Sequence, residues 1–122
     1  SYHLALLEMR SQGPFDERIR DQLVRSDELL RETVVEILEA GIDAGAFEPV
    51  DVDRTAAFVV ATLDGARTRQ VTLGESRPTY QTYTRMVAEE TLSRVVDPLL
   101  TPGTERPTLT ETLADMPDWA DR

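Results

Sequence analysis

Few residues in this sequence could carry out a chemical reaction. It has a single histidine, His3, and no cysteine. A structural zinc site takes several His or Cys ligands, and a carboxylate metal site in a helical bundle takes a Glu three residues before its His, which His3 lacks. Glu89 and Glu90 would point about 100° apart on a helix, so they cannot easily share a proton or a metal. We therefore expect a non-enzymatic chain with no catalytic residues, no metal and no cofactor.

Several polar and aromatic side chains stand next to apolar positions and are candidates for ligand binding. If their segments converge, they would line an apolar cavity with a few polar contacts, as ligand sites do. Alternatively, the tyrosine hydroxyls reach solvent and Arg67 pairs with a surface acid. Arg67 favours an anionic ligand, whereas the tyrosines favour an aromatic or quaternary ammonium one. The candidate ligand-binding residues are Tyr2, His3, Arg67, Gln70, Tyr80 and Tyr83.

The charge balance bears on partners and location. The chain has 23 Asp and Glu against 13 basic residues, all of them Arg, and a net charge of −10. Such a chain repels phosphate backbones, so we expect no DNA binding by these residues alone. The surplus of acid and the missing lysine suit a protein adapted to high salt, or an ordinary acidic protein. No apolar run approaches the ~20 residues that span a bilayer, and no signal peptide is present. We predict a cytoplasmic protein without a membrane partner.

The hydrophobic pattern predicts an all-α bundle of about four to five helices. The predicted helices cover residues 2–12, 15–44, 54–73 and 79–100, with a weak point in the second one at residues 25–27. Gly45 is expected to end the second helix, and Asp51 or Asp53 to cap the third. The third helix is apolar on all sides at residues 56–61, so it must be buried on more than one face.

The chain changes character after Leu100. Residues 101–107 read as a linker, and a two-turn helix could follow. Its apolar residues are the natural anchors of a tail that folds back over the helices, with Trp119 or Leu113 buried. These anchors are Leu109, Leu113, Met116 and Trp119. We therefore divide the chain into a helical domain, residues 1–100, and a C-terminal tail, residues 101–122.

Residues 2–100 resemble the C-terminal half of TetR-type transcription regulators. Residues 35–47 contain a Gly-Ile-x-x-Gly-x-Phe sequence at the end of a long helix. An Asp-containing connector follows at residues 51–53, then an Asp-Gly pair at Asp64 and Gly65 within the next helix, and then a closing helix. The opening residues, 2–10, resemble the fifth helix of such proteins, especially of the subgroup around the choline-responsive betaine repressor.

The resemblance implies a regulator that senses a small molecule and works as a homodimer. In this family a helix-turn-helix domain precedes this half, and we expect it to be absent from this chain, so that DNA is reached only through it. The last two long helices pair with those of a second subunit in a four-helix bundle, which explains why each carries two apolar faces. The predicted dimer-interface residues are Phe58, Thr62, Val87, Ala88, Thr91, Leu92, Val95 and Leu99.

The expected function is thus the regulatory domain of a transcriptional regulator, most simply a repressor. Its partners would be a second copy of the chain and a small-molecule effector whose identity the residues leave open. The alternative is a stand-alone helical interaction module that does not bind DNA, which the anchored tail favours. A helical enzyme is the third and weakest reading, because no nucleophile, metal site or phosphate loop is present.

Overall fold

The computed structural model describes residues 2–114 and confirms the predicted all-α class. Long helices alternate with short 3₁₀ or π turns, and the described range contains no strand beyond a single bridge. The elements in chain order are α1 (Tyr2–Gln12), η1 (Gly13–Phe15), α2 (Glu17–Asp43), α3 (Val52–Leu73), η2 (Pro78–Thr82), α4 (Tyr83–Thr91), η3 (Leu92–Val96), η4 (Asp97–Leu99) and α5 (Leu109–Ala114).

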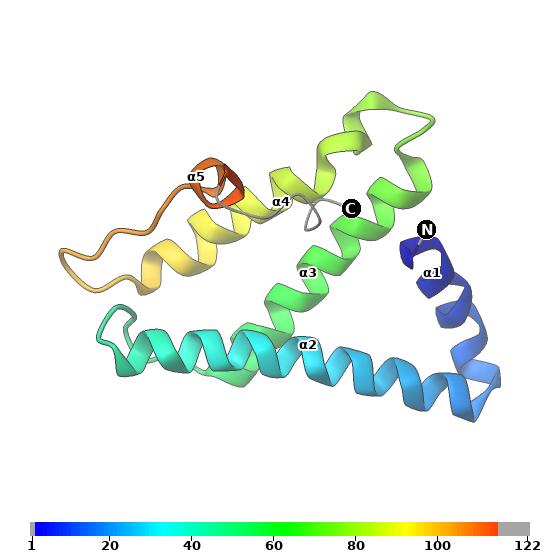
Figure 1. The fold of residues 1–122 in the computed structure, drawn as a ribbon, viewed down its shortest axis with the longest axis horizontal. Coiled ribbons are helices and arrows are strands. Elements are labelled where there is room, and N and C mark those ends of the chain that lie inside the picture. Colours follow the sequence, from blue (N-terminus) through cyan, green and yellow to red (C-terminus); the bar gives the residue numbers. More distant parts are fainter. Residues whose placement is uncertain (1, 115–122) are drawn as a thin grey trace.

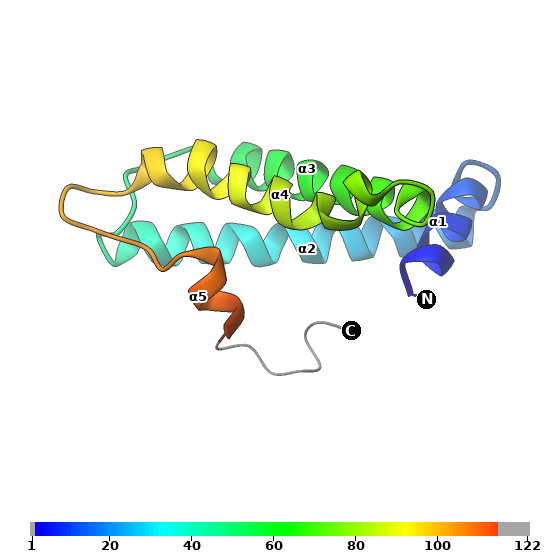
Figure 2. The same ribbon diagram turned by 90° about the horizontal axis from the view of Figure 1, so that it is seen from above.

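The helices form two layers around an open frame. Helix α3 crosses α2, and α4 returns alongside α3 (Figure 1). Seen from above, α3 and α4 share one layer and α2 lies in the other (Figure 2). Helix α1 is joined through η1 to the N-terminal end of α2, and its own N-terminal end lies toward α3. Helices α1, α2 and α3 thus form the three sides of a triangle (Figure 1).

Helix α2 is a single uninterrupted helix of 27 residues. Its N-terminus is capped by Asp16, whose carboxylate accepts hydrogen bonds from the amides of Arg18 and Ile19 at 2.9 and 3.2 Å. The predicted weak point at residues 25–27 is wrong. There, Asp27 instead forms an ion pair with Arg31, one helical turn further on, at 3.1 Å, and such pairs slightly favour a continuous helix.

The turn after α2 explains the glycine spacing of its last residues. Gly45 has a φ of +76°, in the left-handed region that glycine adopts without steric cost, and the helix ends before it as predicted. Gly41 is needed for a different reason, since a Cβ there would overlap the ring of Phe47. The amides of Ala46 and Phe47 both donate to the carbonyl of Gly41, at 2.9 and 3.1 Å. The chain therefore folds back tightly onto its own helix.

This turn is joined to the end of the segment that runs from η2 to η4 (residues 78–99), which we call the α4 segment. Phe47 and Leu100 form an isolated antiparallel bridge. The amide of Glu48 donates to the carbonyl of Leu99 at 2.6 Å, and the amide of Thr101 donates to the carbonyl of Ala46 at 3.0 Å. The hydroxyl of Thr101 also donates to the carbonyl of Gly45 at 2.7 Å. We call residues 45–48 and 99–101 the junction, because they hold the end of α2 against the end of η4.

The helix predicted at residues 79–100 is wrong as a single element. The segment begins with the 3₁₀ turn η2, continues as α4, widens into the π turn η3, and closes with the 3₁₀ turn η4. Pro78 and Pro98 sit in the first turns of η2 and η4. Proline lacks an N–H and clashes with the carbonyl four residues earlier, so a regular α-helix cannot continue through Pro98. Helix α3 also begins two residues earlier than predicted, at Val52, after the Asp51 cap.

The hydrophobic core of the isolated chain is thin. Only three apolar residues in the described range are buried, namely Leu38, Ala56 and Ala66. Large apolar side chains remain exposed on α1, η1, α2, α3 and α4, including Phe15, Leu29, Ile37, Phe58 and Met86. No helix among residues 2–114 is long and apolar enough to cross a membrane. The single chain thus leaves a large apolar surface in contact with solvent.

The glycine geometry of the junction leads to a graded prediction. Gly41→Ala should destabilise the fold by about 1–3 kcal/mol, because the Phe47 ring must move, and Gly45→Ala by about 1–2 kcal/mol, because of its left-handed backbone. Gly65→Ala is the matched control: its Cβ would meet only the tip of Arg69, at 3.4 Å, so it should gain up to about 1 kcal/mol of helix propensity. Urea unfolding of the three variants measures this. Equal losses in all three would contradict the assigned roles.

Candidate functional site

A cleft opens where α1, α2 and α3 enclose the triangle. Its volume is about 470 Å³, within the range of small-molecule sites. Apolar side chains of α1 and α2 line much of it, and charged groups from all three helices border it. The lining residues used below are Tyr2, Leu6, Arg10, Val24, Asp27 and Asp64. We call this hollow the charged cleft.

An ion pair crosses the charged cleft. The Nη1 atom of Arg10 on α1 lies 2.6 Å from Oδ2 of Asp64 on α3. The hydrogen bond to Asp64 is the largest cause that raises the pKa of Arg10 above its ordinary value, which keeps the guanidinium charged. Both side chains are more than a third exposed, at 36% and 38%, so solvent screens the pair and its contribution to stability is about 1 kcal/mol or less. Its role is therefore to set the position of α1 against α3.

His3 and Arg67 meet beside this ion pair. Together with Leu7, Thr68 and Val71 they border a hollow of only about 10 Å³, too small for a ligand. Burial, followed by the positive charge of Arg67, lowers the pKa of His3 below its usual value of about 6.5. The imidazole is therefore held neutral at pH 7, and its ring stands edge-on to that of Tyr2 with centroids 5.4 Å apart.

The six predicted ligand residues divide into two groups. Tyr2 lines the charged cleft, and His3 and Arg67 lie next to it. Gln70, Tyr80 and Tyr83 do not line it. The side-chain oxygen of Gln70 accepts the amide of Thr84 at 3.0 Å, which joins α3 to the start of α4, and the rings of Tyr80 and Tyr83 pack at 5.1 Å. In this structure, Gln70 therefore joins α3 to α4, and the two tyrosines pack on each other where η2 meets α4.

Arg10, Asp64 and Val24 border the cleft but were absent from the predicted site. Asp64 had a signal in the sequence, because it belongs to the Asp-Gly pair inside α3. Arg10 had none, because its partner is 54 residues away and no spacing rule connects them. Val24 reads in the sequence as one more apolar helix position.

A second hollow is almost wholly apolar. It holds about 410 Å³ between α2, the α3–α4 layer and the segment after α4. Val34, Ile37 and Leu38 of α2 form one wall, and Val59 and Leu63 of α3 form part of its floor. The opposite wall consists of residues of the described tail, which we call the C-terminal arm (residues 101–114). Those residues are Arg106, Pro107, Leu109 and Thr112. We call this hollow the apolar groove.

The predicted dimer-interface residues also divide. Four of the eight line the apolar groove, where they face α2 and the arm of the same chain: Ala88, Thr91, Leu92 and Val95. Thr91 is buried, and its hydroxyl donates to the carbonyl of Val87 at 2.7 Å. Phe58 on α3 is 59% exposed, and Thr62, Val87 and Leu99 are half-buried outside the groove. In the single chain, these four residues therefore border a hollow that α2 and the arm also line.

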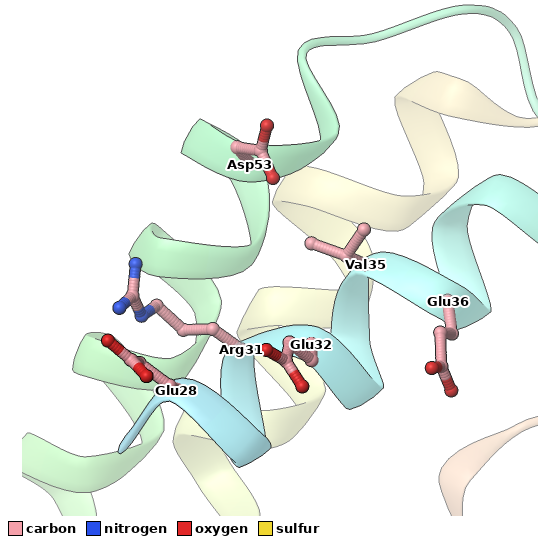
Figure 3. Close-up of a pocket in the computed structure, with 6 residues that line it drawn as sticks. All are labelled: Glu28, Arg31, Glu32, Val35, Glu36 and Asp53. Carbon is pink, nitrogen blue, oxygen red and sulfur yellow. The ribbon is translucent and has the colours of Figure 1, made fainter. Parts of the chain in front are cut away.

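A third hollow is a solvated acidic surface. It lies between the middle of α2 and the start of α3 and holds about 300 Å³ (Figure 3). The residues drawn there are Glu28, Arg31, Glu32, Val35, Glu36 and Asp53. Within residues 2–114, no group of three or more His, Cys, Asp and Glu side chains could hold a metal ion. Like charges on an exposed helix are an ordinary solvated face, so we assign no ligand to this hollow.

The tail anchors can be followed as far as α5. The predicted helix is present at Leu109–Ala114, and Leu109 lines the apolar groove. Leu113 belongs to this helix, but its side chain lies outside what the structure describes. Met116 and Trp119 also lie outside the described residues, so the predicted burial of Trp119 stays a prediction.

Comparison with known proteins gives a family match over most of the chain. The family model described as the C-terminal part of BetI-type transcriptional repressors matches residues 4–101. That range begins within α1 and ends at Thr101, the last residue of the junction, so it leaves out the rest of the arm. Neither a curated protein nor a solved structure gives a significant match.

The lowered pKa of His3 predicts how pH affects stability. The unfolded chain binds a proton at this residue near pH 6.5, whereas the folded chain binds it only at lower pH. The stability that follows from a neutral His3 is therefore present above pH 6.5 and lost as the pH falls through the lowered pKa. Relative to a His3→Gln variant, the wild type should lose stability between pH 7 and pH 5. Urea unfolding at several pH values tests this, and parallel curves would contradict the assignment.

Proposed function

This chain belongs to the family of C-terminal domains of BetI-type transcriptional repressors, and we propose on that basis that it is a homodimeric regulatory domain that senses a small molecule. The family match identifies it as a regulatory domain of a transcriptional regulator. Sensing of a small molecule and dimerisation are what we propose in addition. Residues 1–100 form the sensing and dimerising unit, and residues 101–122 form an appended tail. DNA is bound by a helix-turn-helix segment outside these 122 residues, and the protein acts in the cytoplasm.

The effector site in this proposal is the charged cleft. Its support is one observation: apolar and aromatic surface and an ion pair, contributed by three different helices, meet in a hollow of about 470 Å³. A bound molecule that engages Arg10 or Asp64 would weaken the contact between α1 and α3. Such a ligand would bind more tightly when α1 has moved away from α3. This difference in affinity between two positions of α1 is what allows a ligand to shift the equilibrium between them. Movement of α1 is thus the proposed route from effector to DNA-binding segment.

Filling the cleft tests the effector site. A thermal-shift panel of small carboxylates and quaternary ammonium compounds, with benzoate and choline as the reference pair, should contain a compound that raises the Tm of the wild type. Val24→Trp should abolish that rise, because Val24 lines the cleft and its larger side chain occupies the space. Leu29→Trp is the matched control, since Leu29 lies on the same helix, is 65% exposed and lines none of the hollows described above.

The panel also separates the two ligand classes that the sequence leaves open. Stabilisation by the carboxylates assigns the cleft to an anionic effector, and stabilisation by the ammonium compounds assigns it to a cationic one. An unchanged Tm across the panel, or a shift that Val24→Trp leaves intact, would contradict the charged cleft as the effector site.

The dimer in this proposal uses the α3–α4 layer. Phe58 supports it most directly, because a phenylalanine that is 59% exposed on a helix leaves a large apolar surface in water. The thin core of the single chain points the same way. A second copy packed on this layer would cover Phe58 and Thr62 and, where the arm permits, the four groove residues.

A charge at the interface should separate the subunits. Phe58→Arg should convert the dimer to a monomer at micromolar concentration, because two buried unpaired guanidinium groups would face each other across a twofold axis. Phe15→Arg is the matched control, because Phe15 is equally an exposed phenylalanine but lies in η1, away from α3. Sedimentation velocity measures the outcome. A wild-type monomer would contradict the dimer, and a dimeric Phe58→Arg variant would move the interface elsewhere.

The apolar groove favours one alternative, a stand-alone interaction module. A groove with walls from α2, α3 and α4 could hold an amphipathic segment of another protein. The reading frame upstream of residue 1 separates the two functions. A helix-turn-helix pattern there supports the regulator, and its absence supports the module.

A further inference from the structure

We propose that the charged cleft takes an organic anion, a carboxylate carried on an apolar body, and that Arg20 anchors its charged end. The cleft is here the effector site, so this assignment rests on the proposed function and adds the chemical class of the effector. The two classes that the sequence leaves open, anionic and cationic, differ in which charges of the cleft they would need to find unpaired.

The charge of the cleft differs from that of the whole chain. The sequence has a net charge of −10. Three arginines nevertheless line the cleft, namely Arg10, Arg20 and Arg31. Among the described residues only two acids do so, Asp27 and Asp64, which leaves the lining with one formal positive charge. The cleft is thus a locally cationic surface on an acidic protein, and such a surface is complementary to an anion.

Both acids of the cleft already have a cationic partner. Asp64 accepts a hydrogen bond from Arg10 at 2.6 Å, and Asp27 forms an ion pair with Arg31 at 3.1 Å. The hydrogen bond to Asp64 is the largest cause that raises the pKa of Arg10, and the charge of Asp27 acts in the same direction. A cationic ligand would have to displace one of these arginines, so its binding would cost an existing ion pair.

Arg20 is the cation of the cleft without an acidic partner. Within residues 2–114 it forms no ion pair, and its Nη1 atom donates instead to the carbonyl of Gly13 in η1 at 3.3 Å. Helices α1 and α2 diverge from η1 (Figure 1), so this bond holds the guanidinium at the corner between them. A guanidinium has five N–H donors in a planar fork that matches a carboxylate. Arg20 can therefore receive an anion without giving up another charge.

Apolar side chains continue from Arg20 along the same face of α2. Leu23, Val24 and Leu30 follow it by three, four and ten residues, and all of them line the cleft. Ten residues of helix rise about 15 Å, which is enough for an apolar body several carbon atoms long. Val24 and Leu30 are 48% and 57% exposed in the single chain. A ligand lying on this strip would remove their apolar surface from water, which is favourable.

The aromatic side chains of the cleft do not suit a quaternary ammonium ion. Such ions are bound by several aromatic rings that form a cage. Tyr2 is the single aromatic residue among the described residues that line the cleft. Tyr80 and Tyr83 pack on each other where η2 meets α4 and do not contribute. One ring can cover one side of an apolar body, but it does not enclose a cation.

Three compounds with the same apolar body test the preference for an anion. Hydrocinnamate, hydrocinnamamide and phenethyltrimethylammonium carry a negative, a neutral and a positive group on one phenylethyl unit. Isothermal titration calorimetry on the full chain should show the carboxylate binding about tenfold more tightly than the other two, because hydrogen bonds between charged groups are stronger than those to neutral ones. Val24→Trp should abolish this binding, because Val24 lines the cleft.

Arg20→Gln tests the anchor. It should weaken the binding of hydrocinnamate about tenfold and change that of the amide far less, because a neutral carbonyl gains little from a guanidinium. Arg18→Gln is the matched control: it removes the same charge from the same turn of α2, and Arg18 lines none of the hollows described above. Both arginines are exposed, so the variants should fold, and far-UV circular dichroism checks this.

Several results would overturn the anionic assignment. Equal affinity for the three compounds would do so, as would tightest binding of the ammonium compound, or an Arg20→Gln variant that binds hydrocinnamate as tightly as the wild type. Where Val24→Trp still abolishes the binding, the cleft remains the effector site and only its class is wrong. Binding of none of the three at millimolar concentration also overturns the assignment, and the thermal-shift panel then decides the effector site separately.

Discussion

The junction between the end of α2 and the end of the α4 segment is the constraint on which the other features depend. Gly45 turns the chain with a positive φ, and Gly41 leaves room for the Phe47 ring. The bridge between Phe47 and Leu100 then holds two segments together that are more than fifty residues apart in the chain. Because the junction sets α2 against the α3–α4 layer, it defines two walls of the apolar groove. It also sets the point from which the arm departs.

The two hollows have opposite chemistry, and this separates their proposed roles. The charged cleft carries an ion pair between α1 and α3, so a small polar molecule can compete for Arg10 or Asp64 and change how α1 sits. The apolar groove has little to orient a small polar molecule, but it can bury a large apolar side chain. The proposed sensing site and the apolar groove use different stretches of α2, residues 20–31 for the cleft and residues 34–38 for the groove.

Local signals in the sequence predicted the helices well and the site only partly. The stop at Gly45 and the cap at Asp51 follow from backbone geometry and hydrogen bonding within a few residues, and both are present. The break predicted at residues 25–27 and the single helix at residues 79–100 were wrong. Propensity at a weak position is overridden by the rest of a long helix, whereas Pro98 forces a change of helix type.

The sequence by itself determined the helical class, the family, the glycine turn and the lack of a recognisable catalytic motif, because each depends on residue type or on spacing within a few turns. The tertiary structure alone decided that Arg10 meets Asp64. It also decided that Tyr2 lines the charged cleft and His3 the small hollow beside it, whereas Gln70, Tyr80 and Tyr83 line neither. It also placed four of the expected interface residues under the arm. The physical reason is that helix-to-helix contacts depend on crossing angles and loop closure over many residues, which periodicity does not encode.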